Sequence, residues 1–275
     1  LAVRPDADDA ETLAAVRFLR ISLASMRGEA DAARGLLDEW PRHEAPSDAE
    51  RYMLVRALQA VGDQQAALDA ALASASVGAA LRADPGADED SGGIDFGSGA
   101  SLEGPAHALL FQACQLTRTL GDNERAATLA EALVAADPYA ESGHSVLVAL
   151  HTPSAPLADQ GRLQSAVQGL RSHIPASPLL RFLSARELLQ VGRLGEADRR
   201  LRGLAADVPW DQDPLGALVE TWSVRAARES PDVLADAESF LRGHIAANPS
   251  LLGPRATLAR LLLIQNRSID AVQPV

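Results

Sequence analysis

The chain has 275 residues and a formal net charge of −12, and 47% of its residues are hydrophobic. It lacks the run of about 18 uninterrupted apolar residues that a membrane-spanning helix needs, so the sequence predicts no membrane insertion. A general nucleic-acid-binding function is also disfavoured, because it would require a broad basic surface. All 25 basic residues are Arg, so the chain has no amine for Schiff-base chemistry and no Walker lysine.

The predicted elements are helices throughout, because Leu and Ala dominate and β-branched residues are scarce. The opening LAVRP (1–5) resembles the tail of a helix, and the first helical pair turns at Gly28. A helix with apolar residues at helical spacing, RYMLVRALQAV (51–61), leads to the next turn at Gly62. The segment 84–104 is rich in Gly, Asp and Ser, and we expect an inserted flexible loop there.

The clearest helical pair is GDNERAATLAEALVAADP (121–138). Gly121 permits the positive φ of a turn, Ala126 lets two helices approach closely, and Pro138 ends the second helix. Turn and alanine positions five residues apart recur as Gly28/Ala33, Gly62/Ala67, Gly121/Ala126, Gly161/Ala166, Gly192/Ala197, Asp232/Ala237 and Asn266/Ala271. Pro recurs seventeen residues after the turn, as Pro138, Pro178, Pro209 and Pro249. Both ends of the sequence look incomplete, and we expect a fragment of a longer chain.

Successive turn positions are 34 residues apart at Gly28–Gly62 and again at Asp232–Asn266. With this period and these residues, the chain resembles the tetratricopeptide repeat (TPR) family or a related helical-hairpin solenoid. The first-helix Trp, Leu-Gly and Tyr of that family are mostly missing. The resemblance implies an all-α fold, a right-handed α-α superhelix of about seven helical hairpins with incomplete terminal ones. It also implies one array over residues 1–275.

Candidate catalytic and metal-binding residues are isolated. The single cysteine, Cys114, lies in an apolar run and is expected to be a buried small residue. His144 and His151 are seven residues apart and could share a helix face, but solvated or helix-end positions are the expectation. Acidic residues in 84–104 invite comparison with a calcium loop, yet Glu89 occupies the position where an EF-hand needs Gly. The sequence therefore predicts no enzyme, no cofactor and no metal site.

A surface pattern is the remaining functional signal. Aromatic residues stand ten positions before four turns. Polar residues stand six positions before the same four turns and three positions before three of them, the exception being Leu189. The candidate groove residues are Phe18, Tyr52, Arg56, Gln59, Phe111, Gln115, Arg118, Phe182 and Arg186. In the TPR family this part of the first helix faces the concave groove. Two interpretations stay open: core packing with a solvated polar face, or a peptide-binding groove with arginine forks.

We expect a non-catalytic protein–protein interaction scaffold that binds a peptide or protein segment in its concave groove, with acidic groups on the partner. The alternative is a helical arm of a larger bacterial export, envelope-assembly or polysaccharide-secretion protein, or of an enzyme whose catalytic domain lies outside these residues. These residues show no signal peptide and no transmembrane segment, so the sequence does not assign the protein to the cytoplasm or to the periplasm. The sequence does not indicate whether the chain is a monomer or an oligomer.

Overall fold

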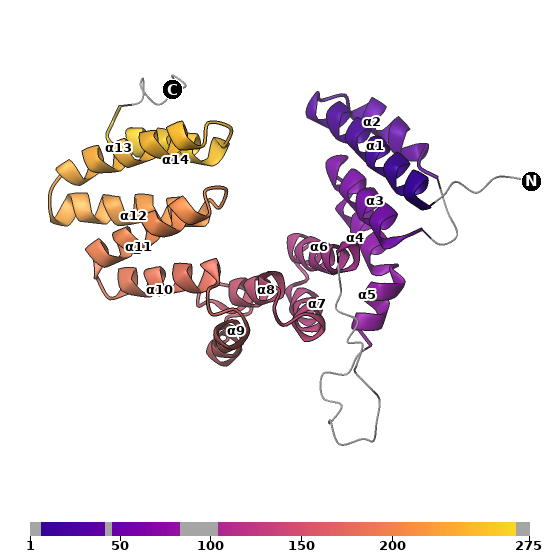
Figure 1. Ribbon diagram of the computed structural model, residues 1–275, viewed down its shortest axis with the longest axis horizontal. Helices are drawn as coiled ribbons and strands as arrows, with labels where there is room; N and C mark the ends of the chain where they lie inside the picture. The colour runs from indigo at the N-terminus through magenta and orange to yellow at the C-terminus, as the bar shows by residue number, and fades with distance from the viewer. Residues whose placement is uncertain (1–6, 42–45, 83–103, 268–275) are drawn as a thin grey trace, which may run out of the picture. The chain divides into compact units, whose positions relative to one another are not determined.

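The computed structural model describes residues 7–41, 46–82 and 104–267 (Figure 1). These residues form fourteen α-helices and no strand, which confirms the all-α class. They divide into two compact units, unit 1 (Leu1–Ile174) and unit 2 (Pro175–Val275). None of the described helices has the length and apolar character needed to cross a bilayer. Apart from Gly104, the predicted loop at 84–104 lies outside the described residues.

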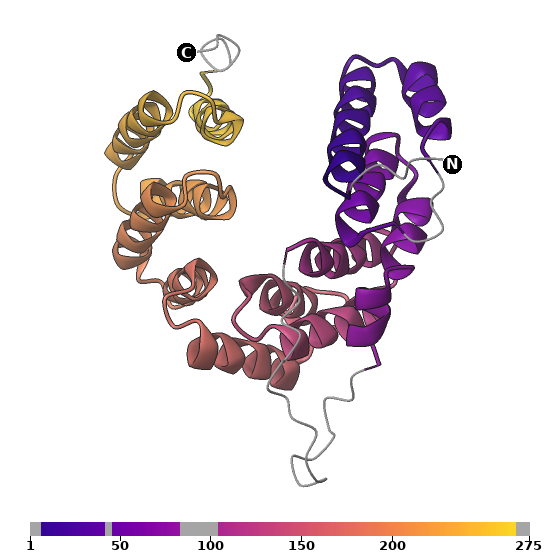
Figure 2. The ribbon, with the colours of Figure 1, turned by 45° about the vertical axis from the view of Figure 1, so that its right-hand side comes forward.

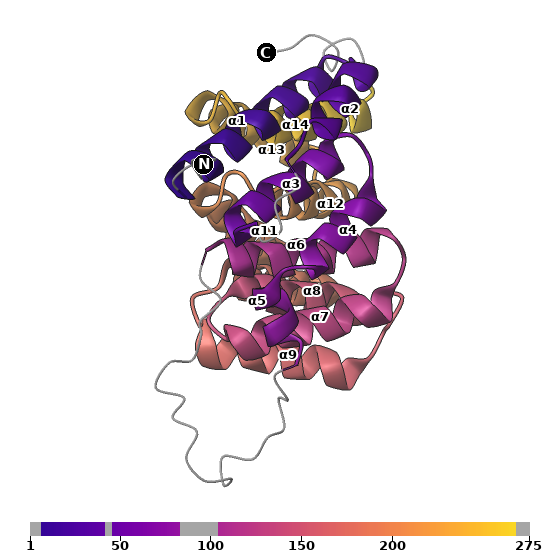
Figure 3. The same cartoon turned by 90° about the vertical axis from the view of Figure 1, so that its right-hand side faces the viewer.

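In its described residues, unit 1 is built from four pairs of helices and one further short helix, α5 (Ala75–Ala80). Its helices are α1 (Ala7–Met26), α2 (Ala30–Asp38), α3 (Asp48–Ala60), α4 (Gln64–Leu72), α5 (Ala75–Ala80), α6 (Pro105–Thr119), α7 (Asn123–Ala136), α8 (Glu141–His151) and α9 (Gln160–His173). Each helix contacts its partner in the pair, and the first helices α1, α3, α6 and α8 also contact one another in that order. Figure 3 shows α1, α3 and α6 following one another along unit 1.

Unit 2 repeats this arrangement with fewer helices. Its helices are α10 (Pro178–Gln190), α11 (Leu194–Asp207), α12 (Asp213–Arg228), α13 (Asp232–Ala247) and α14 (Leu252–Ile264). The first helices α10, α12 and α14 again contact one another in order, as Figure 2 illustrates. One apolar cluster fills the unit around the buried Trp222, Leu218 and Leu241.

The predicted turns are the most regular feature of both units. Gly28, Gly62, Gly121 and Gly192 all have positive φ, between 76° and 87°, and Asn266 has φ 58°. At each turn the amide of the following residue donates to the carbonyl five residues earlier, at 2.8–3.1 Å. The turn amide itself donates to the carbonyl three residues earlier. This pair of bonds is the Schellman motif, which satisfies the last carbonyls of a helix and explains the recurring glycine.

Gly161 does not fit this explanation, and its prediction as a turn residue was wrong. It lies inside α9, whose N-cap is Asp159. The Asp159 carboxylate accepts from the amides of Gly161 at 2.8 Å and Arg162 at 3.0 Å. The connection before α9 is the longer segment 152–159, so no left-handed residue is needed at position 161.

The alanine five residues after each predicted turn position is buried wherever the structure describes it. The exposed fractions are 5% or less at Ala33, Ala67, Ala126, Ala166, Ala197 and Ala237. A methyl group at these positions allows the second helix of a pair to lie close to its neighbours, because a larger side chain would hold the helices apart. Ala271 lies outside the described residues.

Candidate functional site

Three of the predicted groove residues meet on neighbouring helices of unit 1. The guanidinium carbon of Arg56 on α3 lies 5.8 Å from the centre of the Phe18 ring on α1 and 5.9 Å from that of the Tyr52 ring. Arg56 Nη1 also donates to the Tyr52 hydroxyl at 3.1 Å. Both rings are half-buried, whereas Arg56 is exposed. The two rings therefore hold an exposed cation in place by cation–π contact.

The other predicted residues of unit 1 continue along the same row of first helices. The amide of Gln59 on α3 donates to Gln112 on α6 at 3.0 Å, which links these two helices. Phe111 and Gln115 are half-buried on α6, and Arg118 is exposed in its last turn. Among the described residues, no carboxylate lies within 4 Å of the guanidinium nitrogens of Arg56 or Arg118. Arg56 and Arg118 thus belong to the exposed guanidinium groups that have no carboxylate partner among the described residues of unit 1.

The last two predicted residues lie in unit 2, where they have partners of their own. Phe182 on α10 packs against the apolar cluster of the unit. Arg186 Nη1 donates to Glu220 on α12 at 2.5 Å, and both side chains are partly exposed. The structure brings seven of the nine predicted residues onto three adjacent helices of unit 1, and Arg186 is already satisfied inside unit 2.

A buried ionic cluster in unit 2 was missed by the sequence analysis. Asp198 on α11 is 6% exposed. It accepts from Arg202 Nε at 2.9 Å, from Trp222 Nε1 at 2.8 Å and from Arg225 Nη1 at 2.8 Å. Arg202 lies over the rings of Trp222 and Phe240, at 5.4 and 5.0 Å. The Asp198 carboxylate thereby joins α11 and α12, and Arg202 extends the cluster to Phe240 on α13. The partners on α12, Trp222 and Arg225, are too far from Asp198 in the sequence to be recognised from spacing.

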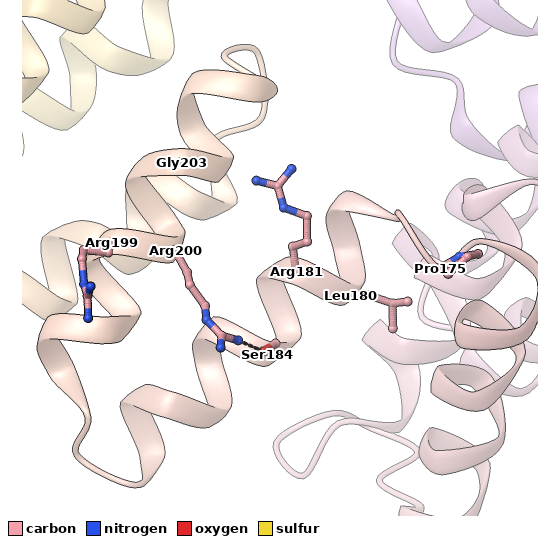
Figure 4. A pocket seen from close by; sticks show the side chains of 7 residues that line it. All are labelled: Pro175, Leu180, Arg181, Ser184, Arg199, Arg200 and Gly203. Atoms are coloured by element: carbon pink, nitrogen blue, oxygen red, sulfur yellow. Dashed lines mark hydrogen bonds between the residues drawn. The ribbon is translucent and has the colours of Figure 1, made fainter.

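A depression of about 500 Å³ on unit 2 has three arginines among its seven lining residues (Figure 4). Its lining residues are Pro175, Leu180, Arg181, Ser184, Arg199, Arg200 and Gly203. Arg200 extends from α11 to the Ser184 hydroxyl on α10, and Arg181 pairs with Asp207 at 2.7 Å. The run RRLR (199–202) was the available sequence signal. Of its three arginines, Arg181 pairs with a carboxylate, whereas Arg200 and Arg199 donate to uncharged oxygens, the Ser184 hydroxyl and the Gly195 carbonyl.

The side chains of His144, His151 and Cys114 are buried, which indicates a structural role. His144 and His151 are both 2% exposed, so neither is solvated, but His151 is the last residue of α8 and has the expected helix-end position. Each hydrogen-bonds a backbone carbonyl, His144 that of Pro138 at 3.1 Å and His151 that of Leu157 at 2.8 Å. Burial raises the pKa of the Cys114 thiol to about 12, which makes it a poor nucleophile. Within the described ranges no three ligating side chains cluster for a metal.

The chain matches no known protein-family model, and no curated protein matches it significantly. The resemblance to TPR units accordingly stays a prediction that depends on the repeated positions.

Proposed function

We propose that this chain is a non-catalytic interaction scaffold, a TPR-like right-handed solenoid of about seven helical hairpins, and that it binds an acidic peptide or protein segment. The binding surface is the face of α1, α3 and α6 in unit 1. The repeated Schellman turns, the buried alanines and the ordered row of first helices support the solenoid architecture.

The observation that carries the proposed binding function is the cluster of Phe18, Tyr52 and Arg56. An exposed guanidinium held over two aromatic rings is preorganised, so a carboxylate can pair with it without ordering a flexible side chain first. Arg118 supplies a second exposed guanidinium group on α6, and the half-buried Phe111 on the same helix supplies apolar surface. This combination of aromatic and arginine side chains is typical of residues that dominate binding energy at interfaces.

The test is a titration of the whole chain with fluorescent peptides that share the same Leu and Phe residues but carry Glu, Gln or Lys elsewhere. We expect the Glu peptide to bind with a Kd in the micromolar range, the Gln peptide more weakly and the Lys peptide not measurably. Binding of the Glu peptide should weaken from low to high salt, because part of its energy comes from exposed charges. Equal affinity for the Glu and Lys peptides, or no binding by either, would contradict the proposal.

A further inference from the structure

The depression on α10 and α11 is basic, although the chain as a whole is acidic. Its lining includes Arg181, Arg199 and Arg200, and no acidic residue lines it. Asp207 pairs with Arg181 from outside the lining, so three guanidinium groups face one carboxylate and positive charge is in excess. In a chain with a formal net charge of −12, this excess is a local feature of unit 2. It can attract an anion at short range, because salt screens the charges that lie farther away.

Arg199 and Arg200 keep most of their hydrogen-bond donors available to a ligand. Arg199 Nε donates to the Gly195 carbonyl at 3.4 Å, and Arg200 Nη1 donates to the Ser184 hydroxyl. The other guanidinium nitrogens of both residues have no partner among the residues that the structure describes. Both side chains are exposed, so a ligand can reach them from water. Guanidinium groups with several available N–H donors bind phosphoryl oxygens through paired, charge-assisted hydrogen bonds.

Ser184 adds an uncharged donor beside Arg200. Its side chain is half-buried on α10, and Figure 4 shows Arg200 reaching it from α11. The Ser184 oxygen accepts from Arg200, whereas its hydroxyl hydrogen has no acceptor within the described ranges. A hydroxyl group can donate and accept at the same time. Arg200 and Ser184 can therefore donate together to one anionic group.

The three guanidinium groups are spread over the depression. In the view of Figure 4, Arg181 and Arg199 lie on either side of the Arg200–Ser184 pair. Arg181 lies beside Gly203, where an added Cβ would be 4.0 Å from Arg181 Nη2. A single phosphate ion is too small to contact groups spread in this way, whereas two linked phosphoryl groups cover a longer stretch. The volume of about 500 Å³ is within the range of small-molecule sites.

We propose that this depression binds a small molecule that carries a diphosphate group. One phosphoryl group accepts from Arg200 and Ser184, and the second accepts from the terminal nitrogens of Arg199. Arg181 adds positive charge while it stays paired with Asp207. The site shares no residue with the proposed peptide surface on α1, α3 and α6, so it is a second binding function and does not depend on the first.

The first test is isothermal titration calorimetry of the whole chain with pyrophosphate, inorganic phosphate and citrate at constant ionic strength. Citrate is the control for charge, because it carries a similar negative charge to pyrophosphate on carboxylates. We expect pyrophosphate to bind with a millimolar or lower Kd, because the arginines are exposed to water and each pair contributes modestly. Phosphate and citrate should both bind more weakly. No binding of pyrophosphate, or equal binding of citrate, overturns the proposal.

The second test compares two double variants that lose the same charge. Arg199→Ala/Arg200→Ala should weaken pyrophosphate binding about tenfold or more. Arg193→Ala/Arg228→Ala removes two exposed arginines of unit 2 that do not line the depression, and it should bind like wild type. Ser184→Ala should bind about threefold more weakly, as expected for one hydrogen bond. Equal losses in the two double variants would show that pyrophosphate responds to charge alone, which overturns the site.

A third comparison separates this site from the peptide surface. Arg56→Ala/Arg118→Ala should bind pyrophosphate like wild type, because neither residue lies in unit 2. Arg199→Ala/Arg200→Ala should in turn leave the affinity for the Glu peptide unchanged. Loss of pyrophosphate binding in the Arg56→Ala/Arg118→Ala variant alone would place the anion on unit 1 and refute the proposed site, whatever the outcome of the peptide titration.

Discussion

The two units have the same helix–turn pattern but use their arginines differently. In unit 2 arginines are paired within the unit, among them Arg181, Arg186, Arg193, Arg202, Arg225 and Arg242. Among the described residues of unit 1, the one ion pair is Arg162–Glu131, at 3.8 Å. Arginine side chains therefore form ion pairs within unit 2, whereas Arg56 and Arg118 of unit 1 have no carboxylate partner among the described residues.

The difference shows that repeat positions and stabilising interactions are specified separately. Both units have left-handed glycines at turns and buried alanines five residues later. Among the described residues, only unit 2 has a buried carboxylate, Asp198, and it joins α11 to α12. A shared backbone pattern thus leaves the side chains of each unit to determine whether its charges stabilise the fold or remain free for binding.

The largest effect is expected from Asp198→Ala. This change leaves Arg202, Arg225 and the Trp222 indole without their shared acceptor. We expect unit 2 to lose about 3 kcal/mol of unfolding free energy, at the lower end of the cost of breaking a buried pair, because both guanidinium groups keep some contact with water. Urea denaturation measures the loss, and hydrogen exchange should locate it in α11–α13.

Asp236→Ala is the matched control for this prediction. Asp236 also pairs with Arg202, but its side chain is 67% exposed. Its removal should cost no more than about 1 kcal/mol. If the Asp198 and Asp236 variants are equally stable, the buried cluster does not stabilise unit 2 as described.

Ala126→Leu should destabilise unit 1 by about 1–3 kcal/mol, because it overpacks a fully buried position on α7. Ala135→Leu on the same helix adds the same atoms at an exposed position and should leave the melting temperature almost unchanged. An Ala126 variant that melts with the Ala135 variant would show that the alanine column does not mark a close helix crossing.

A third prediction compares two glycines, one from each unit. Gly121 has φ 87°, so Gly121→Ala should cost about 1–2 kcal/mol from the left-handed conformation alone. Gly243 lies within α13, and a Cβ there meets nothing within 4 Å. Gly243→Ala should therefore stabilise unit 2 by about 0.5–1 kcal/mol. Shifts of the same sign in both melting temperatures would contradict the assignment of Gly121 to a Schellman turn.

The smallest effect is a pH dependence in unit 2. Burial lowers the pKa of the His244 imidazole, and a hydrogen bond with the Pro209 backbone acts in the opposite direction. Because the unfolded chain binds this proton first, stability should fall as the pH drops below the ordinary histidine pKa, towards the lower folded value. Denaturation at about pH 7.5 and about pH 5.5 measures this, spanning that ordinary value. His244→Gln should remove part of the difference, and an unchanged difference would exclude His244 as its source.

Local features were predictable from the sequence, whereas contacts between distant residues were not. Gly28 and Ala126 could be recognised because a left-handed turn and a close helix crossing each restrict one position to small residues. Gly143 gave no such signal, although a Cβ there would meet Val134 Cγ2 at 2.8 Å, because the approach of α7 depends on tertiary packing. For the same reason, the sequence indicated the Phe18 and Arg56 columns but not the pairing of Arg186 with Glu220.

The most direct test of the account compares the affinity for the Glu peptide in two double variants of the whole chain. Arg56→Ala/Arg118→Ala removes two guanidinium groups of unit 1 that have no carboxylate partner among the described residues, and Arg181→Ala/Arg186→Ala removes two from unit 2 that already have carboxylate partners. We predict that the unit 1 variant binds about tenfold or more weakly, a loss of about 1.4 kcal/mol or more, and that the unit 2 variant binds like wild type. Equal losses in both variants, or a loss confined to the unit 2 variant, would contradict the claim that the face of α1, α3 and α6 binds the acidic partner.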